Sequence, residues 1–113
     1  MSTFINIVRL DAIREVGFAA VTVGYSPFGS LLGHQARLLK VINTTNAGMF
    51  LSFDGTTDND YVPANGFTLY DFTTNSTNTG SFVIQRNTQI YLKYETLPTL
   101  GNVYLVNIYS KGE

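Results

Sequence analysis

The chain has 113 residues, of which 44% are hydrophobic and 13% charged, and its seven basic and eight acidic side chains give a net charge of −1. This length predicts a single domain over residues 1–113, with no room for a second core. The near-zero charge excludes the basic footprint of a nucleic-acid-binding protein. The absence of cysteine excludes disulfides, thiolate metal sites and cysteine nucleophiles, and it indicates folding in a reducing cytosol.

The N-terminal residues 4–10 (FINIVRL) predict a short strand. A terminal strand frays unless it is paired, so residues 1–10 are expected to form an edge strand or one exchanged with a neighbouring copy. Phe4 and Ile5 are interface candidates for this reason. The segment lacks the charged and apolar regions of a secretory signal. No apolar run reaches the roughly 18–20 residues needed to span a bilayer, so no membrane partner is expected.

The next segments predict one strand and one irregular connection. Asp11–Glu15 can form one turn at most because Gly17 ends it, so no significant helix is expected. Residues 18–25 (FAAVTVGY) are small and β-branched, which favours a strand. Residues 26–35 (SPFGSLLGHQ) are broken by proline and glycine. The large apolar residues of this connection must cover the core or face a partner, which makes them interface candidates: Phe28, Leu31 and Leu32.

Residues 38–70 indicate the fold class most firmly. Residues 36–43 (ARLLKVIN) are apolar on both faces, which predicts a central strand. Residues 49–53 (MFLSF) alternate as the next strand, and residues 67–72 (FTLYDF) alternate as another. Residues 56–65 between them are expected to form a loop.

The C-terminal part continues the same pattern. Residues 73–80 (TTNSTNTG) predict a surface loop, and strands are expected at 81–85, 88–94 and 102–109. Within 88–94 the inward row should be Ile90, Leu92 and Tyr94. About seven to eight short strands without a helical period favour an all-β fold, an antiparallel β-sandwich of jelly-roll type.

The chemical candidates in the sequence are few. Asp54, Asp58 and Asp60 could offer the oxygen ligands that calcium prefers. However, EF-hand spacing is missing, and Asp54 followed by Gly55 is a strong turn signal, so we expect neither a metal nor a cofactor. His34 is the only histidine, and no spacing identifies a nucleophile or an orienting partner for it. The sequence therefore predicts no catalytic residue and no enzyme.

Tyrosines offer a different kind of site. Tyr61 and Tyr91 are expected to face outward, where they could anchor a protein interface or stack on sugars. Both are therefore interface candidates, and a carbohydrate- or receptor-binding β-sandwich module is the alternative function. The lack of tryptophan, the commonest sugar platform, counts against that alternative.

Four different turn and strand motifs lie along residues 41–75. They are Asn43-Thr44-Thr45, Ser52-Phe53-Asp54-Gly55, Val62-Pro63-Ala64 and Phe67-Thr68-Leu69-Tyr70-Asp71. Together with Val103-Tyr104-Leu105 and the 109–113 tail, they make the chain resemble small structural proteins of tailed bacteriophages, of the marine-phage type.

The resemblance implies a non-enzymatic virion protein, made in the host bacterial cytoplasm. Its partners would be other virion proteins, namely major capsid, neck or tail proteins. It would act as a capsid decoration (cement) protein or as a neck or tail component. A homo-oligomer is expected because copies in a shell or ring are related by symmetry.

Overall fold

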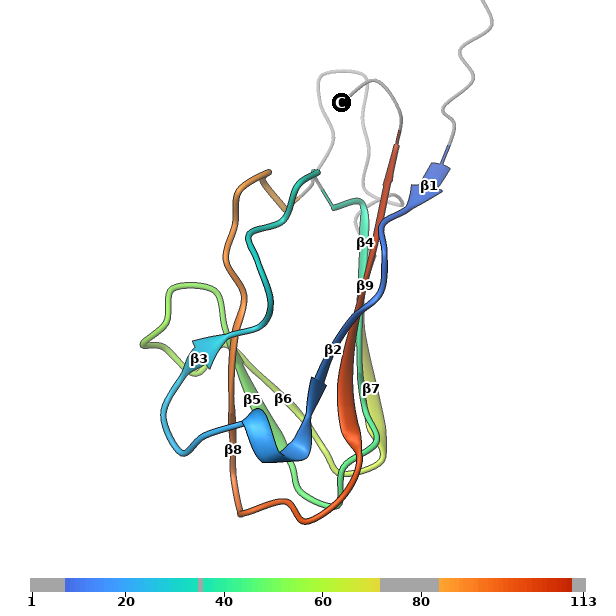
Figure 1. Ribbon diagram of the computed structural model, residues 1–113. Coiled ribbons are helices and arrows are strands. Elements are labelled where there is room, and N and C mark those ends of the chain that lie inside the picture. The colour runs from blue at the N-terminus through green and yellow to red at the C-terminus, as the bar shows by residue number, and fades with distance from the viewer. Residues whose placement is uncertain (1–7, 35, 72–83, 111–113) are drawn as a thin grey trace, which may run out of the picture.

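The computed structural model describes residues 8–34, 36–71 and 84–110 of the chain. These residues form nine strands in two antiparallel sheets that face each other (Figure 1). The same part of the chain holds one short 3-10 turn, Phe18–Ala20, and none of its helical segments could cross a membrane. The predicted all-β antiparallel sandwich is confirmed, with nine strands instead of seven to eight.

One sheet has five strands, with β9 and β4 at its centre. β1 and β2 pair with successive parts of β9, while β7 forms the opposite edge beside β4. Its strands are β1 (Val8–Leu10), β2 (Arg14–Gly17), β9 (Asn102–Ser110), β4 (Leu38–Asn43) and β7 (Gly66–Asp71).

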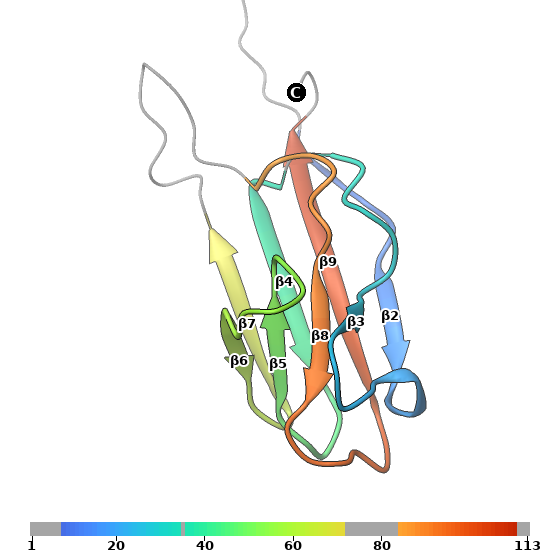
Figure 2. The same cartoon turned by 90° about the vertical axis from the view of Figure 1, so that its left-hand side faces the viewer.

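The other sheet has four strands, in the order β3-β8-β5-β6, and it lies nearest the viewer in Figure 2. Its strands are β3 (Ser26–Pro27), β8 (Tyr91–Tyr94), β5 (Met49–Ser52) and β6 (Asp60–Val62). Because the chain repeatedly crosses between the sheets, β2-β9-β4-β7 faces β3-β8-β5-β6, which is the strand order of a jelly roll.

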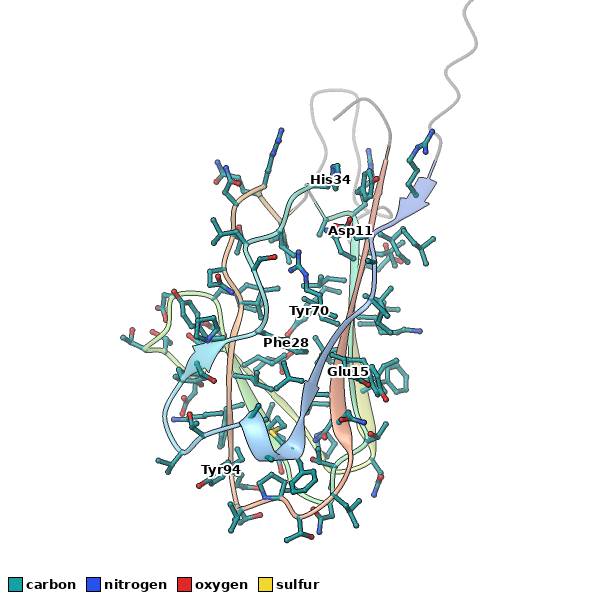
Figure 3. All side chains as sticks on the ribbon, viewed as in Figure 1. Asp11, Glu15, Phe28, His34, Tyr70 and Tyr94 are labelled. Atoms are coloured by element: carbon teal, nitrogen blue, oxygen red, sulfur yellow. The ribbon has the colours of Figure 1, made fainter. Side chains whose placement is uncertain are left out.

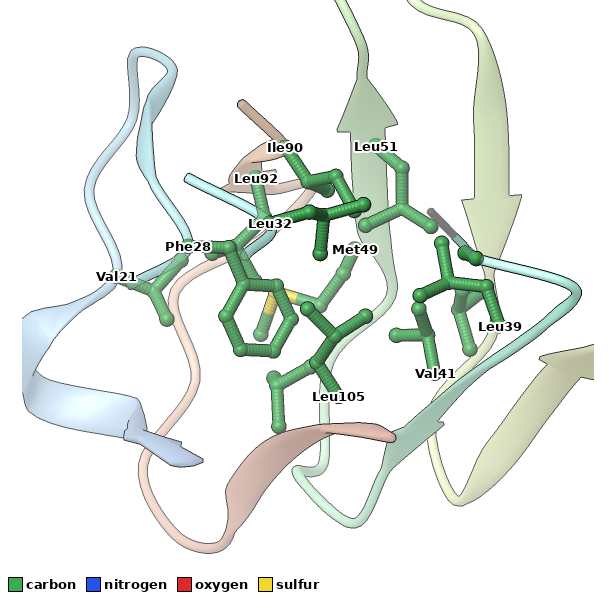
Figure 4. Packing of buried hydrophobic residues seen from close by; sticks show 13 residues of the cluster. Val21, Phe28, Leu32, Leu39, Val41, Met49, Leu51, Ile90, Leu92 and Leu105 are labelled. Carbon is green, nitrogen blue, oxygen red and sulfur yellow. The ribbon is translucent and has the colours of Figure 1, made fainter. Parts of the chain in front are cut away.

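The core lies between the sheets and follows from period-2 alternation (Figure 4). On β4, Leu39 and Val41 are fully buried while their neighbours are half-buried on the other face. Along β8 and the residue before it, the inward row predicted by the sequence is present: Ile90 and Leu92 are buried, and Tyr94 packs against the core cluster. Alternation therefore places these strands correctly.

The connection after β3 corrects an expectation. Residues 28–32 run alongside the chain that precedes β8: the Phe28 N–H donates to the Ile90 carbonyl at 2.7 Å, and the Leu32 N–H donates to the Thr88 carbonyl at 3.0 Å. Phe28 and Leu32 are both 0% exposed. The prediction that they form an interface is wrong, because they fill the core beside β8. Leu31 is 48% exposed and stays a candidate.

The predictions for residues 18–25 and 56–65 were also wrong. Residues 18–25 cross from one sheet to the other and form no strand: they begin with the 3-10 turn, only Val21 of their apolar side chains is buried, and β8 contacts their backbone by a single hydrogen bond, from the Tyr94 N–H to the Thr22 carbonyl at 3.3 Å. Conversely, the predicted loop 56–65 contains β6, whose residues pair with Met49–Leu51 of β5. Phe4, Ile5, the 73–80 loop and most of the 81–85 strand lie outside the described residues; Ile84 forms a bridge with Ala36.

Candidate interaction surface

The outer face of the five-stranded sheet carries apolar side chains where water-facing strands usually carry polar ones. Strand register places Ile42 between Phe67 of β7 and Tyr104 of β9, and Lys40 between Leu69 and Val106. Leu38, Ile108 and Leu10 form a further row across β4, β9 and β1. We call this set the outer apolar face: Leu10, Leu38, Lys40, Ile42, Phe67, Leu69, Tyr104, Val106 and Ile108.

Several of these side chains are open to solvent. Leu10 is 66% exposed, Phe67 64% and Leu69 48%. No described element lies over this side of the sheet, which faces right in Figure 1. A contiguous exposed apolar patch on a small domain marks an interaction site. The face is therefore suited to binding another protein surface.

A pocket of about 300 Å³ hollows one end of the outer apolar face. Lys40, Ile42 and Phe67 line it together with the adjoining ends of β4 and β7, Asn43-Thr44 and Asn65-Gly66. This volume is at the small end of the range for ligand pockets, and it suits one large apolar side chain of a partner.

Two opposite charges flank β9 on this face: Lys40 lies at its centre on β4, and Glu15 lies on β2 opposite Tyr104 (Figure 3). A further charge, Asp71, lies at the β7 edge of the face, opposite Leu38. Within residues 8–34, 36–71 and 84–110, neither the Lys40 nor the Glu15 side chain takes part in any of the hydrogen bonds or ion pairs of the structure. They are the two charges beside β9 that a partner surface centred on this strand would have to match.

The Asp54 carboxylate stabilises the turn that follows β5. It accepts hydrogen bonds from the Thr56 and Thr57 N–H groups, each at 2.8 Å, and from Thr57 Oγ1 at 2.7 Å. Ser52 Oγ also donates to it, and Gly55 takes the positive φ of 87° that the turn requires. The hydrogen bond from the Thr56 N–H is the largest cause that holds the Asp54 pKa well below its usual range.

This turn should make stability depend on pH. Because the folded pKa of Asp54 lies below the unfolded value of about 3.9, its contribution is present above pH ~4 and is lost as pH falls further. We expect Asp54→Asn to lower the melting temperature at pH 7 and to flatten its decline between pH 5 and 2. Thermal unfolding of both proteins across this range tests the expectation, and an unchanged decline in the variant would contradict it.

The other two acidic residues have separate partners. Asp58 accepts a hydrogen bond from Tyr25 Oη at 2.5 Å and pairs with Lys93 Nζ at 3.2 Å; these contacts, Tyr25 first, lower its pKa. Asp60 accepts from the Tyr70 hydroxyl, which ties β6 to β7. Among the described residues no three His, Cys, Asp or Glu side chains are grouped as metal ligands. The three carboxylates are therefore close in the sequence, but each has its own partners and they do not meet at one site.

The remaining predicted residues lie elsewhere. The His34 ring stacks on Tyr109 with centroids 3.8 Å apart. Tyr61 is 40% exposed, and its hydroxyl donates to Glu95 Oε1 at 2.8 Å. Tyr91 is half-buried, with its ring against Gly55. Tyr61 and Tyr91 belong to the four-stranded sheet, on the opposite side of the molecule from the outer apolar face.

The four-stranded sheet has its own outward row of aromatic residues. Phe50 pairs in register with Tyr61 on one side and Lys93 on the other. Lys93 Nζ lies 4.6 Å from the ring centroid of Tyr25 and 5.5 Å from that of Phe50. This row is held together by internal contacts, unlike the outer apolar face.

The sequence did not single out Lys40, Phe67, Leu69 or Val106. Alternation along β7 separates Phe67 and Leu69 from Thr68 and Tyr70, and so it places them on one face. That this face is exposed to solvent is clear only from the structure, in which the opposite row of side chains packs against the second sheet.

Comparison with known proteins identifies the fold. No protein-family model matches the chain, and no curated protein matches it. Its structure is similar to a chain in the acidic stable capsid structure of Helicobacter pylori bacteriophage KHP30, with a TM-score of 0.56 and 13% identity over 96% of this chain and 92% of that one.

A chain of the cyanophage Pam1 capsid asymmetric unit aligns with a TM-score of 0.53 and 11% identity, over 97% of this chain and 89% of the other. A chain of the Bacillus endospore appendages that form disulfide-linked pili aligns with a TM-score of 0.47 and 11% identity, over 97% and 96%. Because these identities are so low, the alignments with the KHP30 and Pam1 chains show a common fold and no more.

Proposed function

We propose, from the fold that this chain has in common with chains of the KHP30 and Pam1 capsids, that it is a non-enzymatic structural protein of a bacteriophage particle. Because a fold can serve many functions, the observation that carries the proposal is the outer apolar face. Phe67 and Leu69 stand 64% and 48% exposed on it, beside a pocket of about 300 Å³. Such a face favours protein–protein contact inside an assembly.

The partners in this proposal are other virion proteins. The chain would be made in the host bacterial cytoplasm and retained in the particle as a capsid decoration protein or as a neck or tail component. The symmetry of its neighbours distinguishes these places: threefold or sixfold neighbours indicate the capsid shell, and a sixfold or twelvefold ring indicates the neck or tail.

A matched pair of valine variants tests the proposal. Val106 lies in the outer apolar face, whereas Val23 is 74% exposed in the crossing between β2 and β3. We expect Val106→Glu to reduce incorporation into particles at least tenfold, because a carboxylate would be buried against a partner. Quantitative mass spectrometry of purified particles measures the copy number.

The control variant, Val23→Glu, should be incorporated like the wild type, and both variants should keep the wild-type melting temperature. Particles that lack a stoichiometric copy of the wild-type chain would contradict the proposal. Equal incorporation of Val106→Glu and the wild type would contradict the role of this face.

A carbohydrate- or receptor-binding module is the second candidate function. The observation that favours it is the outward aromatic row of the four-stranded sheet, where Tyr61 is 40% exposed beside Phe50. Aromatic rings of this kind stack on sugars. A silent glycan array, together with unchanged host attachment of Tyr61→Ala and Tyr91→Ala particles, would remove this candidate.

A further inference from the structure

We infer that the outer apolar face binds a second copy of this chain, in a two-fold symmetric dimer in which Lys40 of each copy meets Glu15 of the other. The inference rests on the proposed function in one respect, namely that this face binds protein. It adds the identity of the partner and the two residues that select it.

The first argument is the placement of the two charges. Lys40 lies opposite Val106 and Glu15 lies opposite Tyr104, so the charges flank β9 on the same face. Two strand spacings of ~4.8 Å and a two-residue step of ~6.8 Å separate their Cα atoms by about 12 Å. Among the described residues Lys40 and Glu15 form no ion pair with each other, so each can pair with a charge on a partner.

The second argument is symmetry. In a two-fold contact, if residue i of one copy meets residue j of the other, then j of the first also meets i of the second. A dimer axis over β9, between Tyr104 and Val106, therefore gives both Lys40 and Glu15 a partner at the same time. Beside β9 the face is complementary to itself in charge, with Lys40 and Glu15 on opposite sides of the axis, while Asp71 lies farther out, at the β7 edge.

The third argument is the free-energy cost of burying this face against any other partner. Val106, Tyr104 and Ile42 surround the two charges with apolar atoms. A purely apolar partner would bury Lys40 and Glu15 without counter-charges, which costs several kcal/mol. A second copy supplies a carboxylate to Lys40 and an ammonium to Glu15 within an apolar contact, and like-charged alternatives are rejected.

The size of the face is close to what a specific interface needs. β9 has nine residues, β4 and β7 have six each, and β1 and β2 together form the remaining edge. At ~3.4 Å per residue and ~4.8 Å per strand, these strands cover roughly 450 Å² of plan area in each copy. Two copies bury about 900 Å², close to the lower bound of about 1,000 Å² for a specific interface.

A charge-swap experiment tests the inference with the purified full chain. Sedimentation velocity over a series of protein concentrations should show a monomer–dimer equilibrium for the wild type. Lys40→Glu and Glu15→Lys should each raise the dimer Kd at least tenfold, because each places like charges opposite one another. The double variant, Lys40→Glu with Glu15→Lys, should return Kd to within about threefold of wild type, since it restores both pairs. Arg86→Glu, an exposed charge reversal in the turn before β8, is the control and should leave Kd unchanged.

The outcomes separate this inference from the proposed function. A wild-type chain that stays monomeric, or a double variant as weak as the single ones, overturns the dimer. If Val106→Glu then still loses particle incorporation, the face binds a different virion protein and the proposed function stands. A dimer with the charge-swap pattern, in a chain that purified particles lack, would support the inference while contradicting the proposed function.

Discussion

Replacing Phe28 with alanine is expected to lower the free energy of unfolding by about 3–5 kcal/mol. The Phe28 ring is 0% exposed and, as Figure 4 shows, it points into the cluster that contains Val21, Met49 and Leu105. Removing it leaves a cavity that two packed sheets cannot readily close, so the cost of the cavity adds to the lost burial. Because a domain of this size is stable by only about 5–15 kcal/mol, the variant should be close to unfolding at 37 °C.

Urea unfolding of Phe28→Ala beside Leu31→Ala measures this effect. Leu31 belongs to the same connection but is 48% exposed, so its truncation should change the free energy of unfolding by no more than about 0.5 kcal/mol. The comparison distinguishes core from interface within one segment. A Phe28→Ala protein that keeps wild-type stability but loses binding to particles would restore the interface role that the sequence predicted.

Replacing Asn43 should destabilise the fold by about 2–4 kcal/mol, through hydrogen bonds instead of packing. Its side chain is fully buried at the end of β4. Nδ2 donates to the carbonyls of Ala47, Val62 and Pro63 at 2.8, 3.2 and 3.1 Å, while Oδ1 accepts from Thr45 N at 2.9 Å and Thr45 Oγ1 at 2.6 Å. One amide thus joins the turn after β4 to the end of β6. Asn43→Ala removes all of these bonds: the Ala47 and Pro63 carbonyls keep Thr45 Oγ1 and the Gly66 N–H as donors, whereas the buried Thr45 N–H loses its acceptor.

Two further variants sharpen the test by urea unfolding. Asn43→Asp keeps the shape but turns a carboxylate oxygen toward three carbonyls, so it should lose more stability than Asn43→Ala at pH 7. Because that environment raises the folded pKa of the new carboxyl, its deficit should shrink as pH falls. Asn46→Ala is the control. The Asn46 side chain forms hydrogen bonds with Thr99 at the surface, and removing them should lower the free energy of unfolding by at most about 1 kcal/mol. Equal losses for Asn43→Ala and Asn46→Ala would contradict the role of the buried amide.

The sequence alone determined the fold class and much of the strand pattern. Period-2 alternation located β4, β5, β7, β8 and β9, and the Asp54-Gly55 turn is present with the glycine at positive φ. These features are local: each depends on residues a few positions apart, whose side-chain directions and turn preferences do not need the rest of the chain. The KHP30 and Pam1 chains have this same fold.

The tertiary structure alone decided which apolar residues are inside. Phe28 and Leu32 lie in an irregular connection whose apolar residues could cover core or face a partner, and only its pairing beside β8 buries them. On β4 both faces are apolar, so alternation could not show which face the second sheet covers.

The same holds for the proposed interface. Lys40 and Glu15 are far apart in the sequence and come to opposite sides of β9 only through the register of β2 and β4 against it. Long-range strand register is set by the whole sheet, and for that reason the outer apolar face and the pair of charges beside β9 could not be found from the sequence.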